Sequence, residues 1–160
     1  MQVEMVIKGL MVDPITNMPI VLLHDRDGSR VLPIWIGVFE ANAIALQIEN
    51  QTTPRPMTHD LLRNVITDLK AAVDRVVVTE LKDNTFYATI YLQVGEGLVA
   101  VDARPSDAIA LALRAKAPIY VDDAVLEGAK TLDTAEPADT DQLQRWLESI
   151  DPEDLGKYKM

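Results

Sequence analysis

The stretch VDARPSDAIALALR gathers four side chains that could do chemistry ahead of a plain apolar run. On a strand, Asp102 and Arg104 project to the same face, because side chains repeat every two residues. Pro105 suits a helix start, and Ser106 and Asp107 are favoured in caps and first helical turns. A helix N-terminus beside a guanidinium also favours binding of phosphate or another anion. Capping explains Ser106 and Asp107, but it does not explain Asp102 and Arg104.

A second polar group lies in the motif RPMTHDLLR. Thr58 is a favoured cap, which would place His59 and Asp60 in a first helical turn and Arg63 one turn after His59. His59 is one of two histidines and the strongest candidate for a general base near neutral pH. An ordinary polar helix start, with Asp60 complementing the helix dipole, explains these residues equally well.

Glu40 and Asn42 stand out because the segment 37–50 has few other polar groups. Either Glu40 fills a place that the helix dipole favours, or it faces a site or an oligomer interface. A helix with so little polar face is expected to be buried on most sides, and a second subunit could supply part of the cover. We therefore predict a homodimer or homotrimer, with the helix 37–50 as the candidate contact.

The residue types also limit which metals the chain could bind. Two isolated histidines and no cysteine cannot form a structural zinc site. A Mg²⁺ or Mn²⁺ site of carboxylates stays open, because hard cations take oxygen ligands and often keep waters. The sequence has no phosphate-binding glycine loop, no GxSxG motif and no aromatic interleaving for stacked bases.

The elements that must position these residues alternate between strands and helices. Strands are predicted at 2–12, 20–24, 30–36, 74–81, 85–94, 98–103 and 119–121. Helices are predicted at 37–50, at 58–73 with Thr58 as cap, and after Pro105. Pro33 indicates an edge position or a bulge within its strand. The predicted fold class is α+β, with a mainly antiparallel or mixed sheet and about three packed helices.

Composition divides the chain into a domain at 1–130 and an appendage at 131–160. Residues 131–140 are rich in Thr, Asp, Ala, Glu and Pro, which is typical of an acidic linker. After them, an amphipathic helix is predicted, with one apolar face. The residues of that face are Leu143, Trp146, Leu147 and Ile150.

The charge and the termini bear on location and partners. The 160 residues carry a net charge of −10, which argues against unspecific nucleic-acid binding unless a basic patch or metal ions compensate. The N-terminus lacks the pattern of a signal peptide, and no apolar run reaches the roughly 18 residues of a membrane span. The absence of cysteine fits a reducing compartment. We expect a soluble, cytoplasmic protein without a membrane partner.

Five segments of the chain resemble the bifunctional nuclease domain family: LPIWIGVFEA, RPMTHDLLRNVI, LKDNTFYATI, VDARPSDAIALALR and APIYV. The resemblance runs from about residue 2 to residue 127, with the segments in the same order and at compatible separations. It implies a compact α+β domain found in homo-oligomers. Because plant members are described as nucleases, it also implies hydrolysis of RNA or DNA.

If that activity holds, we expect His59 to act as base or acid and Arg104 to hold the phosphate together with Arg63 or Arg55. The catalytic candidates are His59, Asp102, Arg104 and Asp107. The candidate substrate contacts are Arg55, Arg63 and Ser106. The candidate ligands of Mg²⁺ or Mn²⁺ are Asp102, Asp107 and Glu40.

An alternative from another class is a non-catalytic homo-oligomeric module that binds a small anion or a protein partner. The acidic surface and the lack of stacking aromatics favour it, and the tail helix could then serve in docking. Local electrostatics separates the two hypotheses. A nuclease should have a basic or metal-lined groove beside Arg104, whereas a scaffold should hold that residue in salt bridges.

Overall fold

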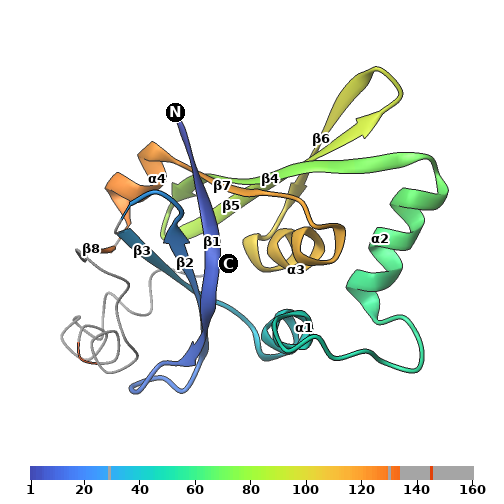
Figure 1. The fold of residues 1–160 in the computed structure, drawn as a ribbon. Coiled ribbons are helices and arrows are strands. Elements are labelled where there is room, and N and C mark those ends of the chain that lie inside the picture. Colours follow the sequence, from blue (N-terminus) through green and yellow to red (C-terminus); the bar gives the residue numbers. More distant parts are fainter. Residues whose placement is uncertain (29, 130, 134–144, 146–160) are drawn as a thin grey trace.

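The computed structural model describes residues 1–28, 30–129, 131–133 and 145. Within these residues the chain forms eight strands and four helices, in the α+β arrangement predicted from the sequence (Figure 1). The strands are β1 (Gln2–Val12), β2 (Pro19–Asp25), β3 (Arg30–Trp35), β4 (Ala71–Lys82), β5 (Thr85–Val94), β6 (Gly97–Ala103), β7 (Ile119–Asp122) and β8 (Leu132–Asp133). The helices are α1 (Val38–Ile48), α2 (Thr58–Asp68), α3 (Pro105–Ala115) and α4 (Asp123–Gly128).

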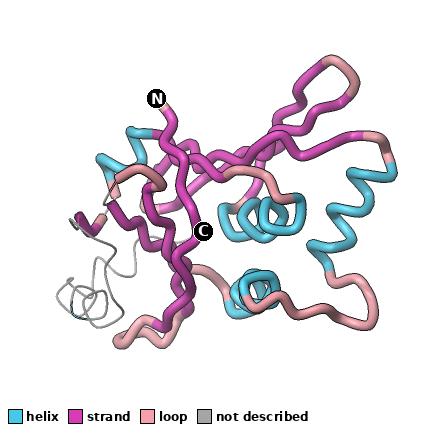
Figure 2. Tube along the Cα trace, in the orientation of Figure 1, coloured by secondary structure: helices cyan, strands magenta, loops and turns pink. Residues whose placement is uncertain are grey.

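One mixed sheet contains all the described strands, in the order β6-β5-β4-β7-β1-β2-β3-β8. Every neighbouring pair is antiparallel except β4 and β7, which run parallel. The helices α1, α2 and α3 lie together on one side, whereas α4 packs against β4 and β7 away from them (Figure 2). The site described below is built in this three-helix layer.

Helix α3 is the centre of the helical layer. It packs on β4 and β5, and both α1 and α2 pack on it. Its residues from Ala108 to Ala112 are each no more than 1% exposed. Most of them are alanine, so neighbouring elements approach closely, and the first turn of α3 is held in a fixed place. The sheet side of the core comes mainly from β2, β3 and β4. Its buried residues include Val21, Leu23, Leu32, Ile34 and Val76.

The second helix differs from its prediction at both ends. Its N-cap is Met57 rather than Thr58, and the Met57 amide donates to Asp60 Oδ2 at 2.9 Å. The helix ends at Asp68 instead of continuing to Val73, because Lys70 adopts a left-handed conformation with φ 64°. Val73 therefore lies in β4, where it pairs with Leu92. Apolar spacing continued past the true end and fitted the strand equally well.

The structure also decides the position of Pro33 in the sheet and adds two short elements to the predicted ones. Pro33 lies opposite Leu22 in an unbroken β2–β3 register, and β8 pairs only with Arg30 and Val31. Among the described residues, Pro33 thus has no partner strand on its outer side, which is the edge alternative of the prediction. Helix α4 and strand β8 are short, and the sequence did not predict them.

The predicted tail helix, with Leu143, Trp146, Leu147 and Ile150, lies outside the described residues. It stays a prediction, as does the boundary between the domain and its tail near residue 130. No helix in the described ranges is long and apolar enough to cross a bilayer.

Candidate functional site

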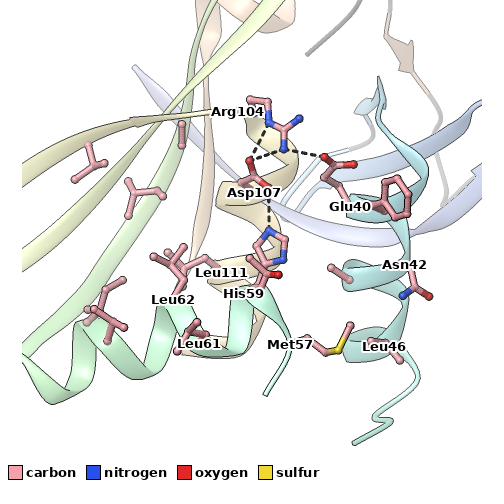
Figure 3. Close-up of a pocket in the computed structure, with 18 of the residues that line it drawn as sticks. Glu40, Asn42, Leu46, Met57, His59, Leu61, Leu62, Arg104, Asp107 and Leu111 are labelled. Carbon is pink, nitrogen blue, oxygen red and sulfur yellow. Dashed lines mark hydrogen bonds and ion pairs between the residues drawn. The ribbon is translucent and has the colours of Figure 1, made fainter. Parts of the chain in front are cut away.

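A groove of about 940 Å³ opens between α1, α2, α3 and the β5–β6 hairpin (Figure 3). Most of its lining residues are apolar. Leu61 and Leu62 of α2 form part of one wall, and Leu111 of α3 lies deeper between the helices. Glu40, His59, Arg104 and Asp107 gather at one end, where the first turns of α1, α2 and α3 meet. This end is the candidate site.

Four polar side chains form a continuous hydrogen-bonded chain at this end. His59 Nε2 lies 2.8 Å from Asp107 Oδ1. Arg104 Nε donates to Asp107 Oδ2 at 2.9 Å, and Arg104 Nη2 is 2.8 Å from the same oxygen. Arg104 Nη2 also donates to Glu40 Oε1 at 2.7 Å. Residues that are 64 positions apart in the chain, Glu40 and Arg104, thus share one ion pair.

Local structure explains why these residues meet. Arg104 is the N-cap of α3, Pro105 is its first residue, and Asp107 lies in its first turn. Glu40 lies in the first turn of α1, and His59 is the second residue of α2. Each helix N-terminus has unpaired amides and a partial positive charge. Three such ends meet here, which favours carboxylates at Glu40 and Asp107 and would also favour a bound anion.

Exposure and electrostatics give the four groups different roles. The side chains of His59 and Glu40 are 12% and 15% exposed, whereas that of Arg104 is 51% exposed and reaches the open groove. The hydrogen bond to Asp107, and then the one to Glu40, raise the pKa of Arg104 although its partial burial opposes this. Because a carboxylate can only accept, a neutral His59 that bonds to the Asp107 carboxylate carries its proton on Nε2 and has a lone pair on Nδ1. In that form His59 can accept a proton.

A second ion pair fixes the three helices behind this chain. Arg114 is buried, with 1% of its side chain exposed, and its Nε donates to Asp60 Oδ1 at 2.7 Å. Its other nitrogens donate to the carbonyls of Ala110 at 2.9 Å and Ala43 at 3.0 Å. Burial alone would raise the pKa of Asp60, but hydrogen bonds from the Met57 amide and from Arg114 outweigh it and lower that pKa. Arg114 therefore joins α1, α2 and α3.

Sequence reasoning did not single out Arg114. The available signal was its position as the one charged residue in the run AIALALRA. A lone arginine on an otherwise apolar helix indicates a buried ion pair, because Lys and Arg are rarely buried without a partner. Asp60, its partner, was predicted only as a dipole-complementing residue.

The predicted site residues separate into three groups. Glu40, His59, Arg104 and Asp107 meet in the chain described above, and Asp102 lines the same groove from β6. Asp102 is exposed and pairs with Thr89 across the β5–β6 ladder. The remaining predicted residues do not join Arg104. They are Ser106, which is 0% exposed, and Arg55 and Arg63, which line a neighbouring cavity.

These positions divide the predicted phosphate contacts between two cavities, and substrate binding by Arg55 and Arg63 stays a prediction. Arg55 and Arg63 lie along the other side of the segment 54–60, so they do not share a cavity with Arg104. Ser106 is the second residue of α3, and at that position the helix turns its side chain into the core. A substrate in the groove would meet Arg104 without these three residues.

The carboxylates of the groove are not arranged as a preformed metal site. In the part of the chain that the structure describes, no three His, Asp or Glu side chains stand together in a way that could hold a metal ion. Arg104 occupies oxygens of both Glu40 and Asp107, which is where a cation shared by those two groups would have to lie. Binding of Mg²⁺ or Mn²⁺ by Asp102, Asp107 and Glu40 stays a prediction.

The groove is acidic rather than basic. Glu40, Asp102 and Asp107 against Arg104 leave a net charge of −2 among its lining residues if His59 is neutral. Arg104 is held in salt bridges, as expected of a scaffold, but half of its side chain remains exposed, as required of a residue that binds substrate. Local electrostatics thus supports part of each hypothesis.

Comparison with known proteins decides the family. The model of the bifunctional nuclease domain matches residues 21–133, which include every residue of the candidate site. This chain belongs to the bifunctional nuclease domain family. It is 39% identical over 162 residues to an uncharacterised protein of Mycobacterium tuberculosis, a match that covers 95% of this chain and 97% of that protein.

Plant relatives match over the domain. The chain is 34% identical over 106 residues to bifunctional nuclease 1 of Oryza sativa subsp. indica, covering 63% of this chain and 32% of that protein. It is 29% identical over 120 residues to bifunctional nuclease 2 of Arabidopsis thaliana, covering 71% and 36%. The match thus spans about a third of each plant protein. Membership predicted from the five sequence segments is confirmed.

Proposed function

We propose that this protein is a nuclease that hydrolyses phosphodiester bonds of RNA or DNA at the polar end of the groove. The observation that carries the proposal is the chain His59–Asp107–Arg104–Glu40, built from three helix N-termini in a bifunctional nuclease domain. A half-buried histidine held by a carboxylate, beside a half-exposed arginine, has the parts of a general base and a phosphate ligand.

In this mechanism a water molecule attacks the phosphorus atom, and the bond to the leaving oxygen breaks. His59 accepts the proton of the water, and the leaving oxygen takes a proton from solvent. Asp107 holds the histidine ring in one tautomer and stabilises its protonated form. Arg104 binds the phosphate oxygens, and the helix N-termini stabilise the added negative charge. Because DNA has no 2′-hydroxyl, a site that cleaves both polymers cannot rely on that group as the nucleophile, and water takes this part in the proposed mechanism.

The test is cleavage of labelled single-stranded RNA and DNA by rigorously purified protein, with Mg²⁺, Mn²⁺ or EDTA. His59→Asn is expected to lower the rate by about 10²- to 10⁴-fold, which is the usual contribution of general acid–base catalysis. An Asp102→Ala/Arg104→Ala variant should also lose activity. His24→Asn, which alters the other histidine, is the matched control. Equal cleavage by wild type and folded variants would assign the activity to a contaminant or to another site.

The Mg²⁺, Mn²⁺ and EDTA conditions of this assay test whether the predicted cation takes part in cleavage. If a Mg²⁺ or Mn²⁺ ion takes part, activity should depend on it and disappear with EDTA. Asp102 is then the carboxylate expected to matter most, because it is exposed and Arg104 does not bind it. Activity in EDTA that persists in wild type and is lost in His59→Asn would assign the chemistry to the protein side chains alone.

The alternative is a non-catalytic module that binds a protein partner or a small anion. The apolar walls of the groove favour a protein partner, because an open apolar groove commonly receives a partner side chain. Cleavage decides between the two functions. A folded protein that cleaves neither polymer under any of the three metal conditions would favour the module.

We also propose that the protein self-associates through α1. Val38 and Phe39 of this helix are 69% and 88% exposed. Apolar side chains at this density usually mark a contact surface. Sedimentation should show a dimer or trimer that Phe39→Glu weakens, whereas a monomeric wild type would refute the proposal. We also propose a cytoplasmic location, which the lack of cysteine fits.

A further inference from the structure

A second cavity, of about 310 Å³, lies between the C-terminal half of α1, the loop that follows it, and α2. It borders the segment 54–60 on the side away from the groove, and Leu46 lines both spaces. Its lining is mainly polar, with donors from the side chains Gln47, Gln51 and Asn64. Nothing in the proposed hydrolysis uses it.

The charge of this cavity is opposite to that of the whole chain. Its charged lining residues are Arg55, Arg63, Arg114 and Asp60, which sum to +2 in a protein of net charge −10. Asp60 and Arg114 neutralise each other in the ion pair that joins the helices. In the described ranges, neither Arg55 nor Arg63 forms a salt bridge. The charge of Arg63 helps to lower the pKa of Asp60, but neither arginine is in a salt bridge within this part of the chain, so both guanidinium groups can meet an anion.

The side chain of Arg63 and the backbone of Arg55 are held in place before any anion binds. Arg63 Nε donates to Asn64 Oδ1 at 3.0 Å, and its Nη1 donates to the carbonyl of Arg114 at 3.3 Å, which leaves Nη2 for a ligand. The backbone of Arg55 lies between two prolines, and its carbonyl accepts from Thr53 Oγ1 at 2.6 Å. Such preorganisation reduces the ordering cost of binding.

We propose that this cavity is a phosphate-binding subsite that takes a backbone phosphate of a single-stranded polynucleotide, beyond the phosphate that is cleaved. Planar guanidinium groups bind phosphate oxygens through paired hydrogen bonds, and amide side chains can bind the sugar. A strand that leaves the groove across the segment 54–60 reaches this cavity next. The polymeric identity of the ligand rests on the proposed function, whereas the anion site rests on the arginines themselves.

The positive cavity would explain how a chain of net charge −10 could bind a polyanion. The groove that would cleave the phosphate has a net charge of −2, so it attracts a polyanion poorly. A subsite of charge +2 beside it would retain the strand by a neighbouring phosphate. Substrate binding and bond cleavage would then depend on different residues.

The experiment measures binding of a short fluorescent single-stranded oligonucleotide by anisotropy, in the full-length His59→Asn protein so that it is not cut. Arg55→Gln/Arg63→Gln is expected to weaken binding by about tenfold for each arginine, which is typical of charge-assisted hydrogen bonds. The slope of log K against log salt should also fall by roughly 0.7 for each lost contact. Arg26→Gln/Lys82→Gln removes the same charge at exposed positions outside both cavities and is the matched control.

The single variant Arg55→Gln guards against misfolding, because the Arg55 side chain is exposed and forms no hydrogen bond in the described part of the chain. Unchanged affinity in both variants, or an equal loss in the control, overturns the subsite. Competition by inorganic phosphate at concentrations comparable with those of the oligonucleotide overturns the polynucleotide as ligand. Cleavage that does not depend on Arg55 and Arg63 refutes the subsite alone. Arginine-dependent binding without cleavage by wild type refutes the nuclease alone.

Discussion

Asp60→Ala should destabilise the protein strongly, because within the described residues it removes the only carboxylate that pairs with Arg114. The guanidinium would keep its hydrogen bonds to the carbonyls of Ala43 and Ala110, but its charge would stay buried without a counter-charge. The Met57 amide at the start of α2 would also lose its acceptor. Both losses fall on the contact that joins the three helices of the site.

The expected magnitude follows from the burial of the pair. Removing one partner of a buried ion pair costs about 3–5 kcal/mol. Asp60 is 20% exposed, so water reaches it, and we expect the lower end, about 3 kcal/mol including the lost cap. For a chain of this size the melting temperature should fall by roughly 6–12 °C. The cleavage rate should also fall, because small displacements of His59 on α2 would separate it from Asp107.

Urea unfolding followed by circular dichroism measures the change in the free energy of unfolding. Asp68→Ala, an exposed carboxylate on the same helix, is the matched control, with a change expected within about 0.5 kcal/mol. Adding Arg114→Met to Asp60→Ala should restore part of the loss if the uncompensated charge is its cause. A change in Asp60→Ala no larger than that of the control would refute the reasoning.

Three further predictions concern the site and its pH dependence. Asp107→Asn should lower cleavage at least about 10²-fold and alter the pH–rate profile, because His59 loses the carboxylate that fixes its tautomer; an unchanged profile would contradict this. Gly37→Ala should reduce activity with little change in stability, because a Cβ at Gly37 would meet the carboxylate of Glu40 and displace it from Arg104. Kinetics and urea unfolding measure the two effects, and a wild-type cleavage rate in this variant would contradict the prediction. Because the pKa of Asp60 is lowered in the folded state, its stabilisation is present above the unfolded value of about 3.9 and is lost as pH falls further. In Asp60→Ala the free energy of unfolding should therefore fall less steeply with decreasing pH than in wild type. An identical slope in the two proteins would contradict this prediction.

The sequence predicted much of the local structure. The strand at 85–94 has the predicted bounds, and the turn at Asp27-Gly28 joins β2 to β3 as an antiparallel pair. Pro105 and Asp107 begin α3 as their residue types indicate. These features depend on neighbours within a few residues, where backbone sterics and capping preferences act. The predicted end of α2 was wrong because the position of Val73 fits the apolar spacing of a helix and also that of a strand.

The candidate site was predicted in part. Its motifs named Glu40, His59, Arg104 and Asp107 as residue types suited to chemistry, and the structure brings these four together. The side of α2 on which Arg63 lies, and the cavity that it lines, depend on how that helix is rotated against α3. Helix rotation is decided by packing against a neighbour that is distant in sequence, so residue spacing alone could not separate Arg63 from Arg104.

By itself, the sequence determined most of the elements and their order, the acidic balance of the chain and the family to which its motifs belong. Only the tertiary structure decided that three helices begin at one place, that Arg114 joins them, and that Ser106 faces the core. The reason is physical. Capping and periodicity are short-range properties of the chain, whereas the meeting of Glu40 with Arg104 across 64 positions requires the whole sheet and α3 to pack first.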